Sequence, residues 1–518
     1  MTVLVACSNY AFAPVEFPNP QLVSIVVPGK GTFDLSAYPL LDRRVIGLVN
    51  LFRDYYNVED LSNASVNDLS MLPPFMTQYF LAFTTYGLAK IADSTPSYRT
   101  DYYKGLFNKV IAMMNSSAME QVEWIKPDFS NINYSELGNS FRGPTNIMWT
   151  GHYALMELLY YDLFRDSRHN DEIKSYMDQW NASLTATTTW DGRPSRGLGR
   201  WGVGLIPCEP YVVFIQCNSI PFFAMRLYDR LHDTNYEQAS LAGISWWQTN
   251  MMNSRGIPVD GYYVAEPLDK HKPQTVIPDT YPGRARTRDS LDPKVSAYGS
   301  AWITMFYNAM GYRTLATTIY GNWRDAFVHY STDGTAYVVD SYYYPHEFET
   351  DDFVGNVFAY FCSREMGDNA LLRRLERWFY SPFEGRWNGY EYSFDTSALG
   401  SLSSFAYPVM NFAWAWGHAD STLADLMNPR NDTFFTTAPF ISSTSTTDGL
   451  FVYQAYYDQA KGAFVLTVEA ASRVVLTFSN FPDVQGVYSA QDAYSNWVQN
   501  GNQMQLTLSP GIYSFVIA

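Results

Sequence analysis

Apolar residues recur at three- and four-residue spacing through most of the chain, and this periodicity limits the possible folds more than any other feature. The stretches PLLDRRVIGLVNLFRDYY, YKGLFNKVIAMMNS and NALLRRLERWFY are typical of it. About nine such segments follow one another, and many are joined by short turns that contain Gly, Asn or Asp. Antiparallel helix pairs connected in this way build α-hairpin arrays or toroids. The sequence therefore predicts a mainly α-helical domain over residues 37–430.

The C-terminal part of the chain follows a different pattern. After NPRNDTFF, apolar and polar residues alternate in short runs such as GAFVLTVEA, SRVVLTFSN and MQLTLSPGIYSFVIA. Gly, Asp and Asn turns separate these runs at intervals of about ten residues, as in small β domains. The pattern predicts an antiparallel β-sandwich over residues 433–518. Residues 1–36 are rich in Pro and in short β-prone runs such as LVSIVV, and they are predicted to form an irregular arm.

Length, composition and charge narrow the class of protein. A chain of 518 residues is long enough for two or three domains. Hydrophobic residues make up 47% and aromatic residues 17%, which supplies a large core and rings to line a pocket or groove. The formal net charge is -16, and Lys and Arg form no cluster along the sequence. Nucleic acids and anionic membranes are bound by such clusters, so neither is a predicted partner.

The N-terminus and the cysteine content bear on the cellular compartment. The first basic residue is Lys30, whereas a secretory signal begins with basic residues and continues into a longer apolar run. No window approaches the 18 or so apolar residues of a membrane-spanning helix, so no membrane span is predicted. Four cysteines in a chain of this length do not amount to a disulfide framework. The prediction is a cytoplasmic protein in a reducing compartment.

Two of the four cysteines, Cys208 and Cys217, lie in the aromatic stretch IPCEPYVVFIQCNS, where a disulfide, a metal site, packing and catalysis are all open interpretations. On one helix their spacing would separate them by about 13.5 Å along the axis, so a disulfide requires the chain to turn, and Pro210 favours a turn. Structural zinc sites usually contain Cys-x₂₋₄-Cys pairs, and this chain has none.

Packing is the simplest interpretation of a cysteine in an apolar run, because a free thiol behaves as a small hydrophobe. It suits Cys362 in AYFCSREM, and it also suits Cys7. The stretch IPCEPYVVFIQCNS differs because polar residues flank both of its cysteines: Glu209 on one side, and Gln216 and Asn218 on the other. This polarity favours a chemical role for the pair.

The run CEPYVVFIQCNS, followed by YDRLHDTNY, resembles the signature of the linalool dehydratase/isomerase family. That family has two cysteines at the same spacing, with Glu-Pro after the first and Gln before the second. Other blocks of this chain resemble family blocks in the same order: YFLAFTTYGLAKIA, NIMWTGHYALMELLYYDL, SAYGSAW and REMGD. The resemblance covers about residues 45–425.

The resemblance implies an (α/α)₆ barrel with a central apolar pocket, to which this chain adds an arm and a C-terminal β domain. It also implies an enzyme that uses neither a metal nor an organic cofactor. Such an enzyme adds or removes water at an allylic alcohol and shifts a double bond by acid–base chemistry. The family forms rings of subunits, so a homo-oligomer is a further expectation.

Site residues follow from the resemblance position by position. The predicted catalytic residues are Cys208, Cys217, His152, Tyr298 and Asp54. The predicted substrate-binding residues are Tyr79, Met148, Glu209 and Tyr55. Asp54 and Tyr55 rest on the Asp and Tyr of the family's first barrel helix, where this chain reads NLFRDYYNVEDLS, and Tyr56 is an alternative to Tyr55. No residue is assigned to a metal.

These residue types fit the chemistry. Hydroxide is a poor leaving group, so an acid must protonate the alcohol as its C–O bond breaks. Aromatic faces can stabilise the allylic cation that develops. Neutral Cys and His titrate near neutral pH and can exchange protons, and a thiol can also add covalently. The sequence therefore predicts that Cys208 and Cys217 handle protons or act as a nucleophile, and that they form neither a disulfide nor a metal site.

Each assignment also has a structural interpretation. His152 could be a core histidine that is bonded to a backbone carbonyl, and Tyr79 and Tyr298 are two of 40 tyrosines that could simply pack. Met148 lies on a helical face that is either core or pocket wall. Glu209 could orient its loop. A further polar set is predicted to form a helix-end salt bridge and cap, comprising Arg364, Glu365 and Asp368.

The preferred function is a cofactor-independent lyase or isomerase that acts on an isoprenoid or other apolar polyene alcohol. This prediction includes hydration, dehydration, double-bond isomerisation and proton-initiated cyclisation. It places the enzyme in specialised metabolism. One alternative is a carbohydrate-active (α/α)₆ enzyme, which would need two carboxylates across a groove. A second alternative is a non-catalytic protein that binds a small molecule. The predicted partner in the preferred case is a small apolar substrate.

Overall fold

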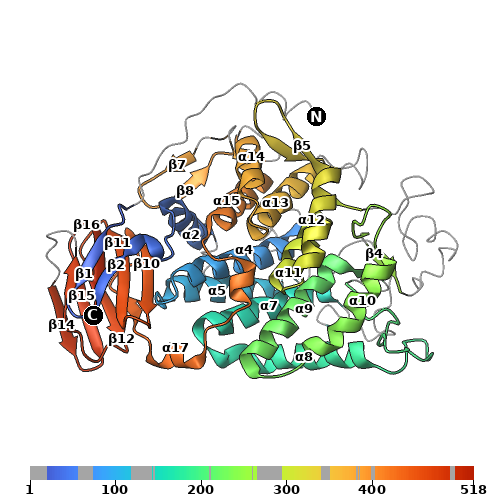
Figure 1. Ribbon diagram of the computed structural model, residues 1–518, viewed down its shortest axis with the longest axis horizontal. Coiled ribbons are helices and arrows are strands. Elements are labelled where there is room, and N and C mark those ends of the chain that lie inside the picture. Colours follow the sequence, from blue (N-terminus) through green and yellow to red (C-terminus); the bar gives the residue numbers. More distant parts are fainter. Residues whose placement is uncertain are drawn as a thin grey trace.

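The computed structural model describes residues 20–55, 74–117, 119, 143, 146–208, 212–259, 261–264, 295–339, 350–380, 383, 385–397, 403–489 and 496–518. The chain is mainly helical and ends in antiparallel sheets, which confirms that part of the predicted fold class. Figure 1 shows the C-terminal strands gathered on one side of the helices. None of the helices in the described ranges has the length and apolarity that crossing a bilayer requires.

Helices of one set, within the described residues, contact one another in a closed cycle. They are α4 (Pro74–Ser94), α7 (Ile147–Phe164), α9 (Ile215–His232), α11 (Ala297–Ala309), α13 (Thr350–Glu365) and α15 (Ser403–His418). Each contacts the next in chain order, and α15 contacts α4. We call this set the inner helices. Two of them, α7 and α11, are buried along almost their whole lengths, as expected of helices enclosed by others.

Outer helices pack against this cycle. They are α2 (Arg43–Tyr55), α5 (Asp101–Met114), α8 (Asn170–Thr185), α10 (Leu241–Asn250), α12 (Arg313–Phe327) and α14 (Asn369–Tyr380). Here α5, α8, α12 and α14 contact the inner helix that precedes each of them, and α2 contacts α15. In α14, Leu371, Leu375 and Phe379 are buried at four-residue intervals, which explains the predicted periodicity of NALLRRLERWFY.

Connections differ at the two ends of the inner helices. An inner helix reaches the next outer helix through a short link, as at residues 310–312 and 366–368. The return segments are longer, and they contain short strands that pair antiparallel. Within one segment, β5 (Val328–Tyr330) pairs with β6 (Ala336–Val338), and β7 (Gly385–Trp387) pairs with β8 (Tyr392–Phe394). The strands β3 (Val212–Phe214) and β4 (Gly261–Tyr263) pair across two successive return segments. Each short strand therefore belongs to a segment that leads into the N-terminus of an inner helix.

A buried asparagine recurs on the inner helices. Asn218 of α9 donates to the Ile206 carbonyl (2.9 Å) and accepts from the Ile206 amide (2.8 Å). Asn356 of α13 holds Val338 in the same two-bond manner, and Asn411 of α15 accepts from the Phe394 amide. A side-chain amide carries both a donor and an acceptor, so it can satisfy the backbone N–H and the C=O of one buried residue. Asn218 and its counterparts thus fix the incoming segment onto each helix.

The C-terminal region consists of two four-stranded antiparallel sheets, with strand orders β10-β11-β16-β13 and β14-β15-β12-β9. The strands are β9 (Phe440–Thr444), β10 (Leu450–Asp458), β11 (Ala463–Ala470), β12 (Val474–Ser479), β13 (Val487–Ser489), β14 (Asn496–Asn500), β15 (Gln503–Leu508) and β16 (Gly511–Ile517). Phe464 of the first sheet packs on Phe478 of the second, with ring centroids 5.2 Å apart. Short helices α16 (Leu423–Leu426) and α17 (Asp432–Thr437) link α15 to this region.

The N-terminal arm was predicted to be irregular, but part of it forms regular structure. Residues 24–34 form a hairpin of β1 (Ser24–Val27) and β2 (Gly31–Asp34). Its buried residues Ile25, Val27 and Phe33 share a hydrophobic cluster with Val465 and Val516 of the C-terminal sheet, and Figure 1 shows the hairpin beside those strands. A hairpin of two short strands is marginal alone, so this one depends on a sheet that is distant in the sequence.

Candidate active site

An aromatic cluster occupies the centre of the inner helices, with the imidazole of His152 in it. Tyr79 and Phe83 reach it from α4, His152 from α7, Trp302 from α11 and Phe358 from α13. The ring centroids of His152 and Trp302 are 5.4 Å apart, and that of Tyr79 is 5.5 Å from His152. Phe83 packs edge-on against both Trp302 and Phe358, at 5.0 and 5.1 Å. The cluster therefore joins four inner helices, and most of its faces are apolar.

His152 is completely buried and has one hydrogen-bond partner in the described part of the chain. Its Nδ1 lies 2.7 Å from the Tyr86 hydroxyl. Its Nε2 has no hydrogen-bond partner within the described residues. Burial lowers the pKa of His152 to about 3 and raises the pKa of Tyr86 well above its usual value. Both groups are therefore neutral at ordinary pH, and Nε2 is left to accept or donate a proton according to the tautomer.

Trp302 adds a second unpartnered polar atom to the same cluster. Its indole Nε1 is buried, and no hydrogen bond to it occurs within the described ranges. A buried N–H without a partner costs free energy, so such a group usually indicates a missing ligand or water, or a catalytic role. Two such nitrogens on adjacent rings can hold one polar group of a ligand whose remainder contacts aromatic faces.

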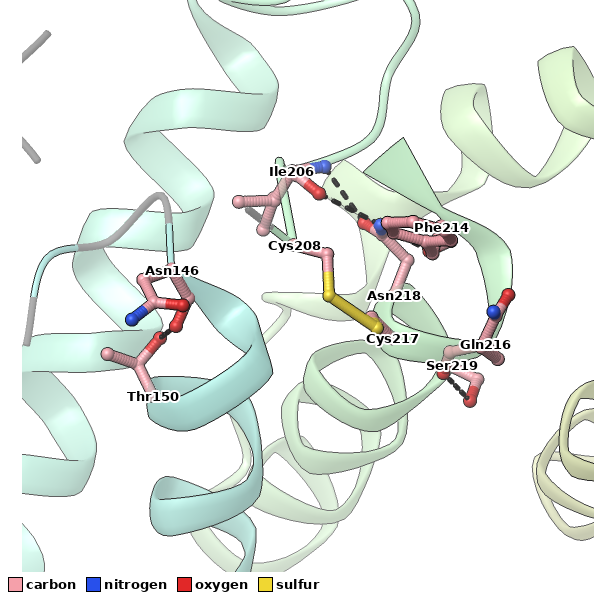
Figure 2. Close-up of a disulfide and its surroundings, with 9 residues drawn as sticks. All are labelled: Asn146, Thr150, Ile206, Cys208, Phe214, Gln216, Cys217, Asn218 and Ser219. Atoms are coloured by element: carbon pink, nitrogen blue, oxygen red, sulfur yellow. Dashed lines mark hydrogen bonds between the residues drawn. A yellow bond between two sulfur atoms is a disulfide. The ribbon is translucent and has the colours of Figure 1, made fainter. Parts of the chain in front are cut away.

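Cys208 and Cys217 form a disulfide, which corrects the prediction that they do not (Figure 2). Their Cα atoms are 6.0 Å apart, within the range that a disulfide can span. The two are close because they do not lie on one helix. Cys208 precedes β3, and Cys217 lies in the first turn of α9. The turn that the sequence left open therefore brings the sulfurs together, and the bonded pair has no thiol proton to give.

The disulfide lies against the start of α7. The Met148 amide donates to the Cys208 carbonyl at 3.3 Å, and the Ile147 amide donates to the Pro207 carbonyl at 3.4 Å. These bonds satisfy first-turn amides that a helix leaves without partners. Met148 is buried, with 5% of its surface exposed, and it lies one helical turn before His152. The cysteines and His152 are thus tied to the same end of the same helix.

The polar neighbours of the cysteines have structural explanations. Asn218 binds the Ile206 backbone and the Phe214 carbonyl, as Figure 2 shows. Ser219 donates to the Gln216 carbonyl at 2.6 Å. Gln216 is buried, and its Oε1 accepts no hydrogen bond from the described residues. The polarity that suggested chemistry at IPCEPYVVFIQCNS therefore comes in part from the asparagine that anchors this segment to α9.

The remaining predicted residues have different placements. Tyr79 and Tyr298 are half-buried, and Tyr298 contacts Phe358 with centroids 6.0 Å apart. Both residues belong to the first two turns of their helices, α4 and α11. Glu209 lies outside the described residues, as do Tyr56 and Cys7. Tyr55 is the last residue of α2, and only its backbone is described.

Asp54 is exposed near the end of α2. Phe52, two positions earlier, contacts Phe412 with centroids 6.0 Å apart, so α2 directs Phe52 inward. Side chains two positions apart on a helix differ in direction by about 200° around its axis, so Asp54 points to the side opposite Phe52. Its neighbour there is Glu391, and burial together with the nearby Asp54 carboxylate raises the pKa of Glu391. Asp54 thus lies at the surface beside the carboxylate of Glu391.

Sequence reasoning missed three members of the aromatic cluster, namely Phe83, Tyr86 and Trp302. A signal for the first two was present, because Tyr79, Phe83 and Tyr86 are spaced at i, i+4 and i+7 and share one helical face. The predicted helix-end salt bridge is present, because Glu365, the last residue of α13, pairs with Lys90 at 2.5 Å, in a buried position that the sequence did not indicate. Asp368 caps α14 by accepting from the Leu371 amide.

The protein is thus mainly helical, and its candidate active site is the buried histidine that aromatic rings surround between the inner helices. Residues 78–278 match the family model described as linalool dehydratase/isomerase. This part of the chain is therefore similar to that family, which supports the predicted resemblance. It contains Tyr79, Met148, His152 and both bonded cysteines, whereas Asp54, Tyr55 and Tyr298 lie outside it.

Solved structures with similar chains are glycoside hydrolases. A family 105 enzyme from C. acetobutylicum ATCC 824 is 9% identical, and the match covers 73% of this chain and 99% of that chain with a TM-score of 0.40. An unsaturated glucuronyl hydrolase specific for heparin is 9% identical, covering 72% and 95% with a TM-score of 0.41. A family 76 enzyme from a bovine Bacteroides thetaiotaomicron strain is 12% identical, covering 66% and 68% with a TM-score of 0.37. Similarity at this level does not extend to function.

Proposed function

We propose that the protein is a lyase or isomerase that acts by acid–base chemistry on an apolar polyene alcohol such as an isoprenoid alcohol. The observation that carries this proposal is the neutral, buried imidazole of His152, whose Nε2 is unpartnered among the described residues and is surrounded by aromatic rings. The family match over residues 78–278, which include this histidine, supports it.

The helical region is an (α/α)₆ barrel in this proposal, with residues 37–430 as its domain and 433–518 as a β-sandwich domain. The closed cycle of inner helices supports the barrel: five of them are each followed by an outer helix, and α15 packs against α2 from the start of the described chain. In such an alternation the inner helices run parallel. Tyr79, His152, Cys217 and Tyr298 all lie in the first two turns of their inner helices, so parallel helices would gather them at one end.

Apolar substrates suit the lining of this site better than charged ones. The described wall consists of the rings of Tyr79, Phe83, Trp302 and Phe358 around His152. These faces contribute burial of hydrocarbon and, beside a developing allylic cation, favourable cation–π contacts of about 0.5–2 kcal/mol each. His152 Nε2 and Trp302 Nε1, which have no hydrogen-bond partner among the described residues, provide the few polar contacts that a single hydroxyl requires.

Loss of water from the substrate needs two proton transfers. One group donates a proton to the hydroxyl as the C–O bond breaks, and water leaves with both electrons of that bond. A second group accepts a proton from the carbon beside the allylic cation, and the C–H electrons form the new double bond. His152 suits the second role, because a proton on Nδ1 can be donated to the Tyr86 oxygen while Nε2 keeps its lone pair.

The cysteine pair is the proposed proton donor, and only its reduced form can serve. A disulfide sulfur carries no proton and is not a thiolate nucleophile. Reduction of the Cys208–Cys217 bond yields two thiols beside the start of α7. Thiols with an ordinary pKa of about 8.5 are neutral acids at pH 7. The proposed active state is therefore the dithiol form, with His152 and a thiol exchanging protons through the substrate.

The test is a product assay on linear terpene alcohols and polyenes, run with and without dithiothreitol. Water loss or double-bond migration that requires the reductant is the expected result. His152→Ala and Cys208→Ala should each abolish turnover while the helical circular dichroism signal stays unchanged. Cys362→Ala is the matched control, since this buried cysteine is outside the site, and it should retain activity.

Two results would overturn the proposal. Full turnover by folded Cys208→Ala and Cys217→Ala variants would exclude the thiols from the reaction. Full turnover by a folded His152→Ala variant would exclude the histidine. Hydrolysis of glycosides by the wild type, with no effect of either substitution, would instead establish the carbohydrate-active alternative.

A further inference from the structure

A second cluster of titratable groups lies between α7 and α8, apart from the aromatic cluster. It consists of Glu157 on α7, His169 in the 3-10 turn Ser167–His169 and Glu172 in the first turn of α8. One ligand atom from each residue lies within 4.8 Å of the others. Glu157 follows His152 by five residues on the same helix, so the cluster is structurally connected to the candidate active site.

Glu157 is the unusual member, because its side chain is fully buried. Neither carboxylate oxygen accepts a hydrogen bond from the described residues. Its Oε1 lies 2.9 Å from the His169 Nδ1, so the two atoms are close without the geometry of a hydrogen bond. Ligands that share one zinc ion have donor atoms a few ångströms apart, since each lies about 2 Å from the metal, and the three side chains meet this requirement.

Among the described residues, no Lys or Arg pairs with Glu157 or Glu172, and the ion-pair partner of Glu157 is His169. Lys104 and Arg168 pair with Asp166 instead. The Tyr153 hydroxyl donates a hydrogen bond to the Glu172 carboxylate at 3.5 Å. Two carboxylates and an imidazole therefore converge without a Lys or Arg partner from the described part of the chain.

We propose that Glu157, His169 and Glu172 bind one Zn²⁺ ion and thereby fasten α7 to α8. One imidazole and two carboxylates are ligands that zinc accepts, with a water molecule in the fourth tetrahedral position. The imidazole nitrogen disfavours Mg²⁺ and Ca²⁺, which take oxygen ligands. The role is structural: the ion neutralises a buried carboxylate and holds the helix that carries Met148 and His152.

Zinc binding is measured on the full-length protein with its Cys208–Cys217 disulfide intact, so that these thiols do not compete for the metal. The protein is stripped with a chelator, and Zn²⁺ is titrated back by calorimetry and quantified after gel filtration. One equivalent should bind and raise the melting temperature, because a ligand that binds only the folded state stabilises it. Mg²⁺ at the same concentration should do neither.

Ligand variants make the assignment specific. Glu157→Gln, His169→Gln and Glu172→Gln should each weaken zinc binding by about 100-fold or more, since even the loss of an outer partner of a metal ligand costs 10–100-fold. His169 and Glu172 are partly exposed, so their variants keep the test open if Glu157→Gln does not fold. The melting temperature of each variant should no longer respond to Zn²⁺.

The pair His418 and Glu376 provides a matched control. It is also a His–carboxylate contact, at 3.2 Å, but its carboxylate accepts from Trp414 and no third ligand is grouped with it among the described residues. Glu376→Gln should therefore keep one equivalent of zinc. Absence of zinc binding by the wild type would overturn the proposal, and so would zinc binding that the three ligand variants leave unchanged.

Discussion

Lys90 and Glu365 form a buried ion pair that the replacement of Lys90 by Met would break. The two side chains are 0% and 1% exposed, and their charged atoms lie 2.5 Å apart. The Lys90 ammonium also donates to the Trp416 carbonyl and lies over the Trp416 ring. Glu365 accepts from the Trp416 indole and from the Leu423 amide. The pair thereby joins α4, α13, α15 and α16 near the C-terminal ends of the inner helices.

Lys90→Met should lower the free energy of unfolding by about 3–5 kcal/mol, the cost of leaving one partner of a buried ion pair uncompensated. The length and apolar volume of the side chain are nearly kept, so the loss reports the charge. Unfolding in urea, followed by circular dichroism with recovery checked on dilution, measures it. The double variant Lys90→Met/Glu365→Gln should regain at least about 1 kcal/mol, because it no longer buries an unpaired charge.

Lys174→Met is the control, since Lys174 pairs with Asp178 across one helical turn and both are more than half exposed. Exposed pairs of this kind contribute about 0.3–0.5 kcal/mol. If Lys90→Met costs no more than Lys174→Met, the buried pair does not stabilise the helical cycle. If the double variant is less stable than Lys90→Met, the unpaired charge of Glu365 is not the cause of the loss.

Three further predictions concern the candidate active site. Tyr86→Phe should lower turnover about tenfold, because it removes the hydrogen bond to the buried Nδ1 of His152, a loss of about 1–3 kcal/mol; unchanged kinetics in the folded variant would contradict this. The pKa of His152 is about 3 in the folded chain against an ordinary 6.5, so the stability it contributes is present above pH 6.5 and is lost as the pH falls toward 3. Between pH 7 and pH 4.5 this amounts to about 2–3 kcal/mol, and urea unfolding of His152→Phe should show a correspondingly flatter pH dependence than the wild type. Asn218→Leu removes both bonds to the buried Ile206 backbone, and should cost about 2–3 kcal/mol in thermal unfolding, whereas an unchanged melting temperature would show that the segment anchors itself without this amide.

Much of the helical architecture was readable from local pattern. The period of about 3.6 in NALLRRLERWFY reflects one buried face, which α14 has. Alternation in the C-terminal runs reflects strands with one inward face, as in β12, where Val474, Leu476 and Phe478 are buried. The hairpin of residues 24–34 was not predicted, because its stability comes from contact with Val465 and Val516, more than 400 residues away.

The candidate site was readable only in part. The Cys-Glu-Pro block led to the family and to His152, and the family match over residues 78–278 includes both. The hydrogen bond from His152 to Tyr86 and the packing of Trp302 against it could not be derived from the sequence. They depend on the way α4, α7 and α11 are rotated against one another, which local periodicity does not specify.

The sequence by itself determined the elements of this protein: helices through the middle, strands at the end, and a cysteine pair and a histidine helix that resemble those of a known family. Those features follow from spacing and residue type, which act within a few turns of chain. Only the tertiary structure decided that Cys208 and Cys217 meet in a disulfide, that His152 is neutral with one nitrogen unpartnered among the described residues, and that Glu157, His169 and Glu172 converge. Those outcomes depend on burial and on contacts between separate elements, and burial sets both the charge state of a side chain and the partners within its reach.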